Sequence, residues 1–336
     1  MTKGTITIKD VAREAKVSVA TVSRALNGHT NVAEPVRRHV HDVAERLRYS
    51  PHAAARSLSS RHTQTIGVVL PDLYGEFFSE LIRGIDGVAR AHCQHLLVSS
   101  YHGNQDEQGR ALRAMRGRVD GLLVLSPYAE NPDFLIANLP PSLPTVLINT
   151  RLPNDQYPVL NIDDHVGAVT MTEHLIAAGH RRIAFIAGPP SNYDARERLR
   201  GFRDALAACA GQVQGSELPG DFDEASGYRA GQALLAAGQL PDAVFAANDM
   251  MALGCLYALT QAGVRVPEDV ALAGFDDIPL TRFVHPPLTT MQVSIAELGE
   301  RAMTRLRALI DRPDAADLQR QTLTPVLVVR KSSARE

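Results

Sequence analysis

The stretch VSVATVSRALNG, residues 17–28, predicts a short helix with two different faces. At about 100° per residue, Val22, Ala25 and Leu26 share one face. The opposite face carries small and polar residues, namely Ala20, Ser23, Arg24 and Asn27, with Val19 at its border. Because an isolated helix shorter than about 12 residues is marginal in water, the apolar face must pack on neighbouring helices. The other face then stays exposed and is available to bind a partner.

Two further helices are predicted around this one. Thr7 is a candidate N-cap with Asp10 three residues later, a variant of the capping box, and Ser18 can cap the helix that follows. A third helix is predicted over residues 34–47, with Pro35 in its first turn. Three short helices with a three-residue turn between the first two indicate an all-α helix-turn-helix domain.

The charge of the chain is divided unevenly. Residues 1–61 carry 11 lysines and arginines against 5 acidic residues, a net charge of +6, and the remainder carries 24 against 32, a net charge of −8. A basic head on an acidic body is typical of a nucleic-acid-binding module joined to a second domain. Between them, residues 51–64 are rich in alanine, serine and arginine and predict a linker that becomes ordered only against a partner.

After Thr65, short apolar runs alternate with helical patterns for about 270 residues. Near-continuous apolar strands that alternate with helices predict parallel sheets covered on both faces, here in two subdomains with a cleft between them. Ligands of such sheets bind where the strands end and the loops begin. The ranges so selected are 71–78, 126–128, 149–151, 189–198, 248–249 and 276–277.

The polar and aromatic residues of these loops suit a hydroxyl-rich ligand, but two of them have a structural alternative. Asp249 can cap the helix that begins at Met250, and this is the favoured interpretation of that residue. Arg198, within RERLR, can equally lie on a solvated helix face.

Catalytic and metal-binding patterns are missing from the sequence. It contains no GxSxG, GxxxxGK[ST] or HExxH motif, and His174 and His180 are six residues apart, off one helical face. The three cysteines, Cys93, Cys209 and Cys255, are widely separated, which indicates buried or idle thiols. No apolar run reaches the roughly 18 residues needed to span a membrane. We therefore expect a cytoplasmic protein that is not an enzyme and has no cofactor, metal site or membrane contact.

The chain closely resembles the LacI/GalR transcriptional repressors. The resemblance is carried by TIKDVAREAKVSVATVSRALNG, YSPHAAARSL, GHRRIAFIAGP, ARERLRGF, GDFDEASGYRAG, ANDMMALG, GFDD and PPLTT, in this order. It implies a helix-turn-helix domain over residues 1–50 and a hinge helix over 51–64. It also implies a periplasmic-binding-protein-like body of two Rossmann-like subdomains, residues 65–162 with 291–323 and residues 163–290 with 324–332, with crossovers near 161–163, 289–292 and 322–325.

The resemblance also implies the residues of two sites. Val19, Ala20 and Arg24 would face base edges in the major groove. Nearer the phosphates would lie Thr7, Ser18, Ser23 and Asn31, and Leu58, supported by Ala55, would enter the minor groove. The residues implied for the effector pocket are Phe77, Phe78, Asn149, Arg198, Phe222, Asn248 and Asp276. Two positions depart from the family, His52 in place of the usual Asn and Ala33 in place of the usual capping Ser.

The implied function is that of a ligand-responsive repressor of carbohydrate-utilisation genes. It would bind near-palindromic operator DNA as a homodimer and respond to a small sugar or sugar derivative. A purine or nucleoside effector is the alternative, because Phe222 would stack on either. A sugar-binding protein without a regulatory role has no use for the basic N-terminal module, and a sugar-modifying enzyme lacks a recognisable nucleophile. The C-terminal residues VRKSSARE contain no leucine heptad, so a dimer is expected rather than a tetramer.

Overall fold

The computed structural model divides the chain into two compact units, residues 1–65 and 66–336, and each is described by itself. The described residues are 6–27, 31–49, 62–128, 132–151, 156–209, 211–312 and 318–333. Within these ranges no helix is both long enough and apolar enough to cross a membrane.

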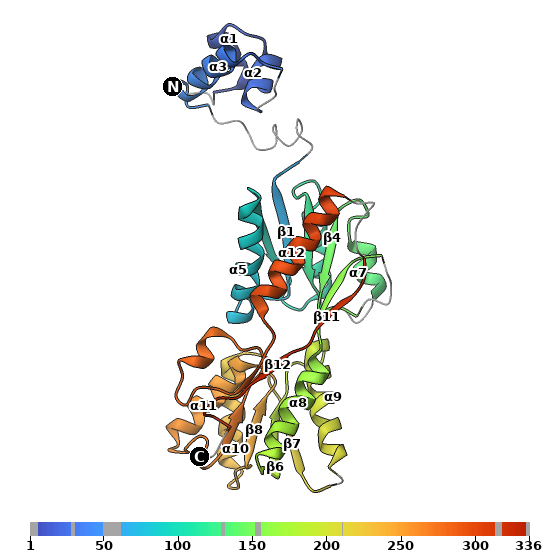
Figure 1. Ribbon diagram of the computed structural model, residues 1–336, viewed down its shortest axis with the longest axis vertical. Helices are drawn as coiled ribbons and strands as arrows, with labels where there is room; N and C mark the ends of the chain where they lie inside the picture. Colours follow the sequence, from blue (N-terminus) through green and yellow to red (C-terminus); the bar gives the residue numbers. More distant parts are fainter. Residues whose placement is uncertain are drawn as a thin grey trace. The chain divides into compact units, whose positions relative to one another are not determined.

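The first unit contains three helices, α1 (Ile8–Ala15), α2 (Val19–Leu26) and α3 (Glu34–Arg46) (Figure 1). Their mutual core includes Val11, Val22 and Val40, none of which is exposed. The predicted caps are present: Asp10 accepts from the backbone nitrogen of Thr7 at 3.0 Å, and Ser18 Oγ accepts from that of Thr21 at 3.0 Å. Ala33 stands at the N-cap of α3 without a side-chain hydrogen bond. The helix-turn-helix prediction is thus confirmed.

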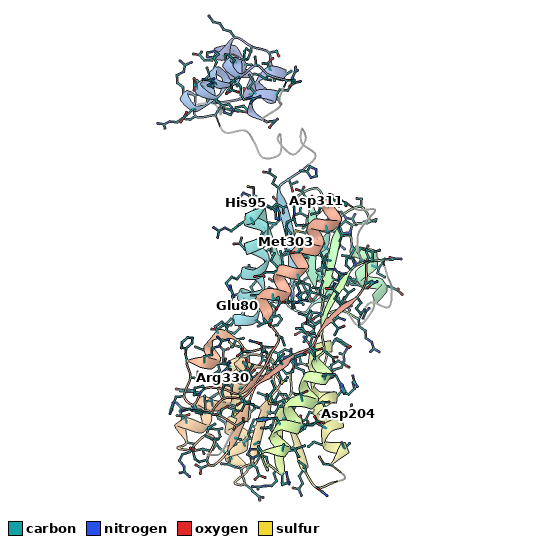
Figure 2. All side chains as sticks on the ribbon, in the orientation of Figure 1. Glu80, His95, Asp204, Met303, Asp311 and Arg330 are labelled. Carbon is teal, nitrogen blue, oxygen red and sulfur yellow. The ribbon has the colours of Figure 1, made fainter. Side chains whose placement is uncertain are left out.

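A six-stranded parallel sheet forms the first lobe of the second unit. Its spatial order is β11 (Gln321–Leu323), β5 (Val159–Ile162), β4 (Thr145–Ile148), β3 (Gly121–Leu125), β1 (Thr65–Leu70) and β2 (His95–Ser100). Its helices are α5 (Glu76–Ala91), α6 (Gln105–Ala114), α7 (Pro132–Asn138) and α12 (Ile295–Asp311). Successive strand residues face opposite sides: Val68 joins the core beneath α5 and α12, whereas Val69 joins the core beneath α6. Met303 of α12 is fully buried (Figure 2).

A four-stranded parallel sheet forms the second lobe. Its order is β7 (Gln214–Leu218), β6 (Arg182–Ile186), β8 (Ala243–Ala246) and β9 (Ala271–Ala273). Its helices are α8 (Asp164–Ala177), α9 (Tyr193–Ala208), α10 (Glu224–Ala236) and α11 (Asp249–Gln261). At its centre, Phe185 stacks on Phe202 with ring centroids 4.9 Å apart and meets Phe245 edge-on at 5.1 Å. The predicted pair of parallel-sheet subdomains is therefore confirmed.

The chain passes between the two lobes three times (Figure 1). It leaves the first sheet after β5 to enter α8, and returns after β10 (Thr290–Gln292) to α12. It leaves again after β11 to form β12 (Val326–Val328), which pairs antiparallel with β10. Neither lobe is therefore built from one continuous segment.

In both sheets the first strand of the lobe is flanked on one side by the second strand and on the other by the third. β1 lies between β2 and β3, and β6 lies between β7 and β8. Ligands of open parallel sheets bind outside the carboxyl ends of the strands at such switch points. The topology therefore favours a ligand site among the residues that follow β1, β3, β6 and β8.

Helices α10 and α11 approach so closely that the contact requires glycine. A Cβ atom at Gly254 would overlap the carbonyl oxygen of Glu224, and one at Gly227 would overlap that of Met251. We expect Gly254→Ala to lower the free energy of unfolding by about 1–3 kcal/mol, because the backbone must move to make room. The control is Gly87→Ala on α5, where nothing lies near the added atom. Denaturant titration of both variants tests this, and equal stabilities would contradict it.

Candidate functional site

The face of α2 that the core leaves uncovered carries the residues predicted to contact bases. Val19 is 41 % exposed, and Ala20 and Arg24 are exposed beside it. Arg24 Nε donates to the backbone oxygen of Ala20 at 3.2 Å, which holds the arginine along the helix. Ser23 is half-buried. The face thus offers methyl groups for apolar contact and one guanidinium for hydrogen bonding.

The residues predicted to lie nearer phosphates are placed differently from one another. Thr7, Ser18 and Asn31 are exposed, whereas Ser23 accepts from Asn27 Nδ2 at 3.4 Å. Ala55 and Leu58 lie outside the described residues, as does His52.

A pocket of about 460 Å³ opens between the two lobes of the second unit, at the carboxyl ends of both sheets. The first lobe contributes residues after β1, β2 and β3, and the second lobe contributes residues after β6, β7, β8 and β9. The lining set is Pro71, Asp72, Tyr74, Gly75, Phe77, Phe78, His102, Gly103, Leu125, Pro127, Tyr128, Ser191, Asn192, Asp194, Arg198, Asp221, Phe222, Asp223, Asn248, Met250 and Asp276. Pockets of this size and mixed polarity are typical of small-molecule sites.

Arg198 is the centre of the polar part of this pocket. Although it belongs to a helix, its side chain is 4 % exposed. Its Nε donates to Asp164 Oδ1 at 2.7 Å and its Nη1 donates to the backbone oxygen of Ala247 at 2.6 Å. The guanidinium carbon lies 3.9 Å from the centroid of Phe275, a cation–π contact. The alternative of a solvated helix face is thus wrong for Arg198.

Asp276 faces the same guanidinium with an incomplete set of contacts. Its Oδ1 lies 3.2 Å from Arg198 Nη1, yet the pair lacks hydrogen-bond geometry, and this oxygen is buried without a hydrogen-bond partner in the described chain. A buried carboxylate oxygen in this state is costly unless a donor reaches it. A ligand hydroxyl is such a donor.

The buried carboxyl groups around Arg198 have raised pKa values. Burial raises the pKa of Asp276 to about 7, against the opposing effect of Arg198. Burial likewise raises the pKa of Asp164, and that of Asp194, where the charge of Asp164 adds to the effect. Burial opposes the positive charge of Arg198, but Asp164 and Asp276 more than offset this and raise its pKa. Shifts of this kind cluster at functional sites.

Three of the predicted pocket residues have left-handed backbone conformations. Their φ angles are +45° at Asn149, +66° at Phe222 and +118° at Asp276. Such values are uncommon outside glycine and persist where the surrounding structure imposes them. Phe222 also places its ring 5.8 Å from the guanidinium of Arg198, so the aromatic and cationic parts of the pocket adjoin.

Asn149 and Asn248 act partly through other residues. Asn149 is buried behind the residues that line the pocket, and its Nδ2 donates to Oδ2 of one of them, Asp194, at 3.0 Å. Asn248 lines the pocket and is the N-cap of α11, accepting from the nitrogen of Met251 at 2.9 Å. The prediction that Asp249 is this cap is wrong, because Asp249 is fully buried and accepts instead from Ile278 nitrogen and Thr290 Oγ1.

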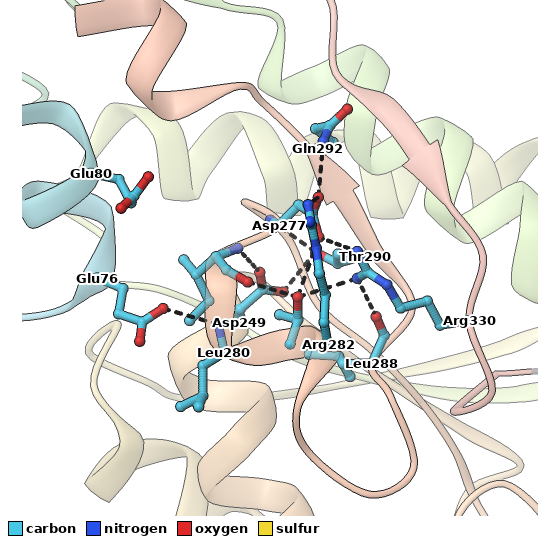
Figure 3. Close-up of polar contacts among 12 residues, drawn as sticks. Glu76, Glu80, Asp249, Asp277, Leu280, Arg282, Leu288, Thr290, Gln292 and Arg330 are labelled. Atoms are coloured by element: carbon cyan, nitrogen blue, oxygen red, sulfur yellow. Dashed lines mark hydrogen bonds and ion pairs between the residues drawn. The ribbon is translucent and has the colours of Figure 1, made fainter. Parts of the chain in front are cut away.

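A second polar network lies behind Asp276 and is centred on Asp277 (Figure 3). Asp277 Oδ1 pairs with Arg330 Nη2 at 2.6 Å, and its Oδ2 accepts from Gln292 Nε2 at 3.0 Å and pairs with Arg282 Nη2 at 3.3 Å. Asp276, which lines the pocket, is thus followed directly by Asp277. The side chain of Asp277 connects this part of the chain to Gln292 of β10 and to Arg330 of the C-terminal segment.

Contacts join the two lobes across the pocket. The hydroxyl of Tyr74, after β1, donates to Glu224 of α10 at 2.9 Å. Glu76 of α5 accepts from the backbone nitrogen of Leu280 at 3.2 Å, in the short helix η1 (Pro279–Arg282) (Figure 3). Both contacts start from the segment after β1, at residues 74 and 76, and connect it to the second lobe.

Sequence reasoning missed part of the lining. His102 and Gly103 follow β2, and Asp221 and Asp223 follow β7. The strand pattern of residues 95–101 was visible in the sequence, so the strand-end rule could have selected His102. The strand β7, with sequence QGSEL, is mostly exposed and lacks the apolar run that marks the others.

Two family descriptions match this chain, one in each of its two compact units. A family profile described as "Bacterial regulatory proteins, lacI family" matches residues 7–52, and one described as "Periplasmic binding protein-like domain" matches residues 172–333. The ribose operon repressor of Escherichia coli (strain K12) is 38% identical over 329 residues, which are 97% of this chain and 99% of that protein.

Two further relatives have similar coverage. The HTH-type transcriptional regulator GalR of Escherichia coli (strain K12) is 37% identical over 330 residues, 97% of this chain and 95% of that protein. A crystal structure of the lac repressor dimer bound to operator and the anti-inducer ONPF aligns with a TM-score of 0.85 and 30% identity, covering 98% of this chain and 99% of that chain. These relatives are named as repressors or regulators. The chain belongs to the LacI family of bacterial regulatory proteins.

Proposed function

We propose that this protein is a cytoplasmic, ligand-responsive repressor of carbohydrate-utilisation genes and not an enzyme. It binds a near-palindromic operator as a homodimer and is controlled by a small sugar in the pocket between its lobes. The observation that carries the proposal is that one chain holds both an exposed, partly apolar α2 face and a pocket of mixed polarity between the two lobes of its second unit. Ribose is the first candidate class of ligand, since the ribose operon repressor is 38% identical to this chain.

In this proposal the α2 face enters the major groove of DNA. Val19 and Ala20 contact thymine methyl groups, and Arg24 donates two hydrogen bonds to guanine. Thr7, Ser18, Ser23 and Asn31 contact phosphates, while Ala55 and Leu58, outside the described residues, belong to the hinge over residues 51–64 that opens the minor groove. Residues 1–50 form the module that reads the half-site.

The body responds to the effector through its two subdomains, residues 65–162 with 291–323 and residues 163–290 with 324–332. Phe77 and Phe78 enclose the ligand from one side, and Phe222 and Asn248 enclose it from the other. Arg198 and Asp276 bind its hydroxyl groups, with Asn149 behind them holding Asp194 in place. Closure around the ligand shifts the equilibrium between operator-binding and released states by the difference in the ligand's affinity for the two states.

The DNA part of the proposal is tested with an operator selected from a random pool of duplexes. We expect a two-fold symmetric site whose binding constant falls log-linearly with salt, because phosphate contacts release counterions. Arg24→Ala should weaken the free energy of operator binding by about 1–3 kcal/mol and reduce the selectivity for one base at one position of each half-site.

The matched control is Arg13→Ala, which removes the same charge from α1, where Arg13 pairs with Asp10 at 3.1 Å. It should weaken binding to all sequences alike. Fluorescence anisotropy on the selected site and on single-base variants measures both effects. Unchanged selectivity in Arg24→Ala would remove α2 from base recognition.

A further inference from the structure

The loop after β9 holds two consecutive residues in left-handed backbone conformations. The φ angles are +118° at Asp276 and +56° at Asp277. Such conformations are costly for residues other than glycine and persist only where the surrounding structure imposes them. The contacts that hold this pair of residues therefore bear on how Asp276 faces the pocket.

The side chain of Asp276 does little to fix its own position. Its Oδ1 lies 3.2 Å from Arg198 Nη1 without hydrogen-bond geometry, and this oxygen has no hydrogen-bond partner in the described chain. The backbone nitrogen of Asp276 donates to the backbone oxygen of Met291 at 2.8 Å. The place of the carboxylate thus depends on the backbone, and so on the residues that hold the backbone.

Asp277 supplies the side chain that holds this backbone. Its carboxylate is 1 % exposed, with Oδ1 paired to Arg330 Nη2 at 2.6 Å and Oδ2 accepting from Gln292 Nε2 at 3.0 Å (Figure 3). Arg282 also pairs with Oδ2, but it is more than half exposed and is the weaker partner. Charge-assisted hydrogen bonds of this length are strong. A carboxylate buried this deeply leaves its cation only at a large cost in free energy.

Arg330 is itself fixed by the C-terminal segment. Two residues later, Ser332 is fully buried, and its Oγ donates to the backbone oxygen of Leu272 in β9 at 2.6 Å. Among the described residues, the pocket lining includes neither Asp277 nor Arg330. The pair therefore reaches the pocket through Asp276.

We infer that Asp277 and Arg330 are positioning residues for the effector, because their buried pair fixes the backbone that presents the Asp276 carboxylate. The C-terminal segment thereby helps to set the affinity for the effector without lining the pocket. The inference rests on the proposed function and adds to it two residues outside the pocket wall. A pair that only stabilised the fold would leave the affinity of the folded protein unchanged when it is removed.

The test is calorimetry with ribose and with galactose, at a temperature at which each variant is folded. Arg330→Met should weaken binding of the sugar that the wild type binds by about 10-fold or more, the loss expected when a hydrogen bond to a charged group is misaligned. If Arg330→Met does not fold, the double variant Asp277→Asn/Arg330→Met takes its place, since it leaves no buried carboxylate without a cation. The double variant should show the same loss of affinity.

The matched control is Arg182→Met, at the start of β6, where the arginine pairs with Asp242 at 2.7 Å. This pair lies in the same lobe, at the opposite end of the strands from the pocket. Urea denaturation measures the stability of both variants, and the control should keep its affinity for the sugar whatever stability it loses. Equal losses of affinity in the two variants would overturn the inference.

Crystal structures without ligand test the same pair independently of the sugar. In Arg330→Met, or in the double variant, the Asp276 carboxylate should move from its place beside Arg198 by about 1 Å, a displacement large enough to cost such a factor. An unmoved carboxylate, or a sugar affinity within about threefold of the wild type, would overturn the inference. If neither sugar binds the wild type while operator binding is normal, the sugar effector of the proposed function is wrong, and the position of Asp276 alone decides the inference.

Discussion

Replacing Arg198 with methionine is expected to lower the free energy of unfolding by about 3–5 kcal/mol at pH 8, since it leaves buried carboxylates without their cation. Methionine retains a flexible apolar side chain beside Phe275, so the loss is one of charge more than of packing. Asp164, Asp194 and Asp276 then have no buried positive partner among the described residues around them. The variant should also lose effector binding.

The loss of unfolding free energy caused by Arg198→Met should become smaller as the pH falls. Burial already raises the pKa of each of the three carboxyl groups, to about 7 for Asp276, so the folded state holds these protons more tightly than the unfolded state. Removing the guanidinium raises these pKa values further. Ionisation of these groups therefore destabilises the folded variant as the pH rises, and their protonation removes this destabilisation as the pH falls.

Denaturant titration at pH 5, 6, 7 and 8 measures this dependence. The matched control is Arg200→Met, two residues along α9, where the arginine is half-exposed and pairs with Glu197. An exposed ion pair of this kind contributes at most about 1 kcal/mol. The assignment of Arg198 as the positive partner of the buried carboxyl groups would be contradicted in two cases. In one, Arg198→Met loses no more unfolding free energy than the control; in the other, its loss is the same at every pH.

Asp276→Asn is expected to weaken effector binding about 100-fold, because a buried hydrogen bond to a charged group is strong and its loss leaves the ligand's donor unpaired. Operator binding without effector should change less than about threefold, roughly 0.7 kcal/mol. Asparagine keeps the shape of the side chain but turns one acceptor into a donor that faces Arg198. The ligand therefore loses its acceptor while the fold is retained.

Calorimetry with the best-binding sugar, and operator titration in its presence and absence, measure the two effects separately. Asp204→Asn serves as the control, since Asp204 is an exposed carboxylate on α9 that pairs with His165 and Arg200. Wild-type affinity in Asp276→Asn would take this carboxylate out of the ligand's contacts. A parallel loss of effector-free operator binding would show instead that the substitution damages the body.

Local signals explain which features could be predicted from the sequence. The caps at Thr7 and Ser18 depend on residues three positions apart, and the strands of the second unit are continuous apolar runs, so both are visible along the chain. The partner of Arg198 is 34 residues away at Asp164, and no periodicity connects the two. Burial of an ion pair is decided by the packing of α8 on α9, which the sequence pattern alone does not specify.

One signal for Arg198 was nevertheless present. Within RERLR, Arg196 and Arg200 look equivalent to it, but only Arg198 falls at helical spacing with Ala195 and Phe202, both of which are buried. An arginine on the apolar face of a helix is expected to meet a buried partner. The prediction that Asp249 caps α11 was wrong because it used only local sequence. Asp249 stands at the start of α11, as a cap would, but it accepts hydrogen bonds from Ile278 and Thr290, 29 and 41 residues away.

The three passages of the chain between the lobes bear on how the protein is made at the ribosome. The first sheet lacks its edge strand β11 and its covering helix α12 until residue 323 has emerged, and the second lobe lacks β12 until residue 328. The first lobe cannot finish folding until all of the second lobe except β12 has been translated. Such long-range pairing slows folding, and the partly made chain exposes the apolar surface beneath α12 to other molecules until α12 itself, residues 295–311, has been made.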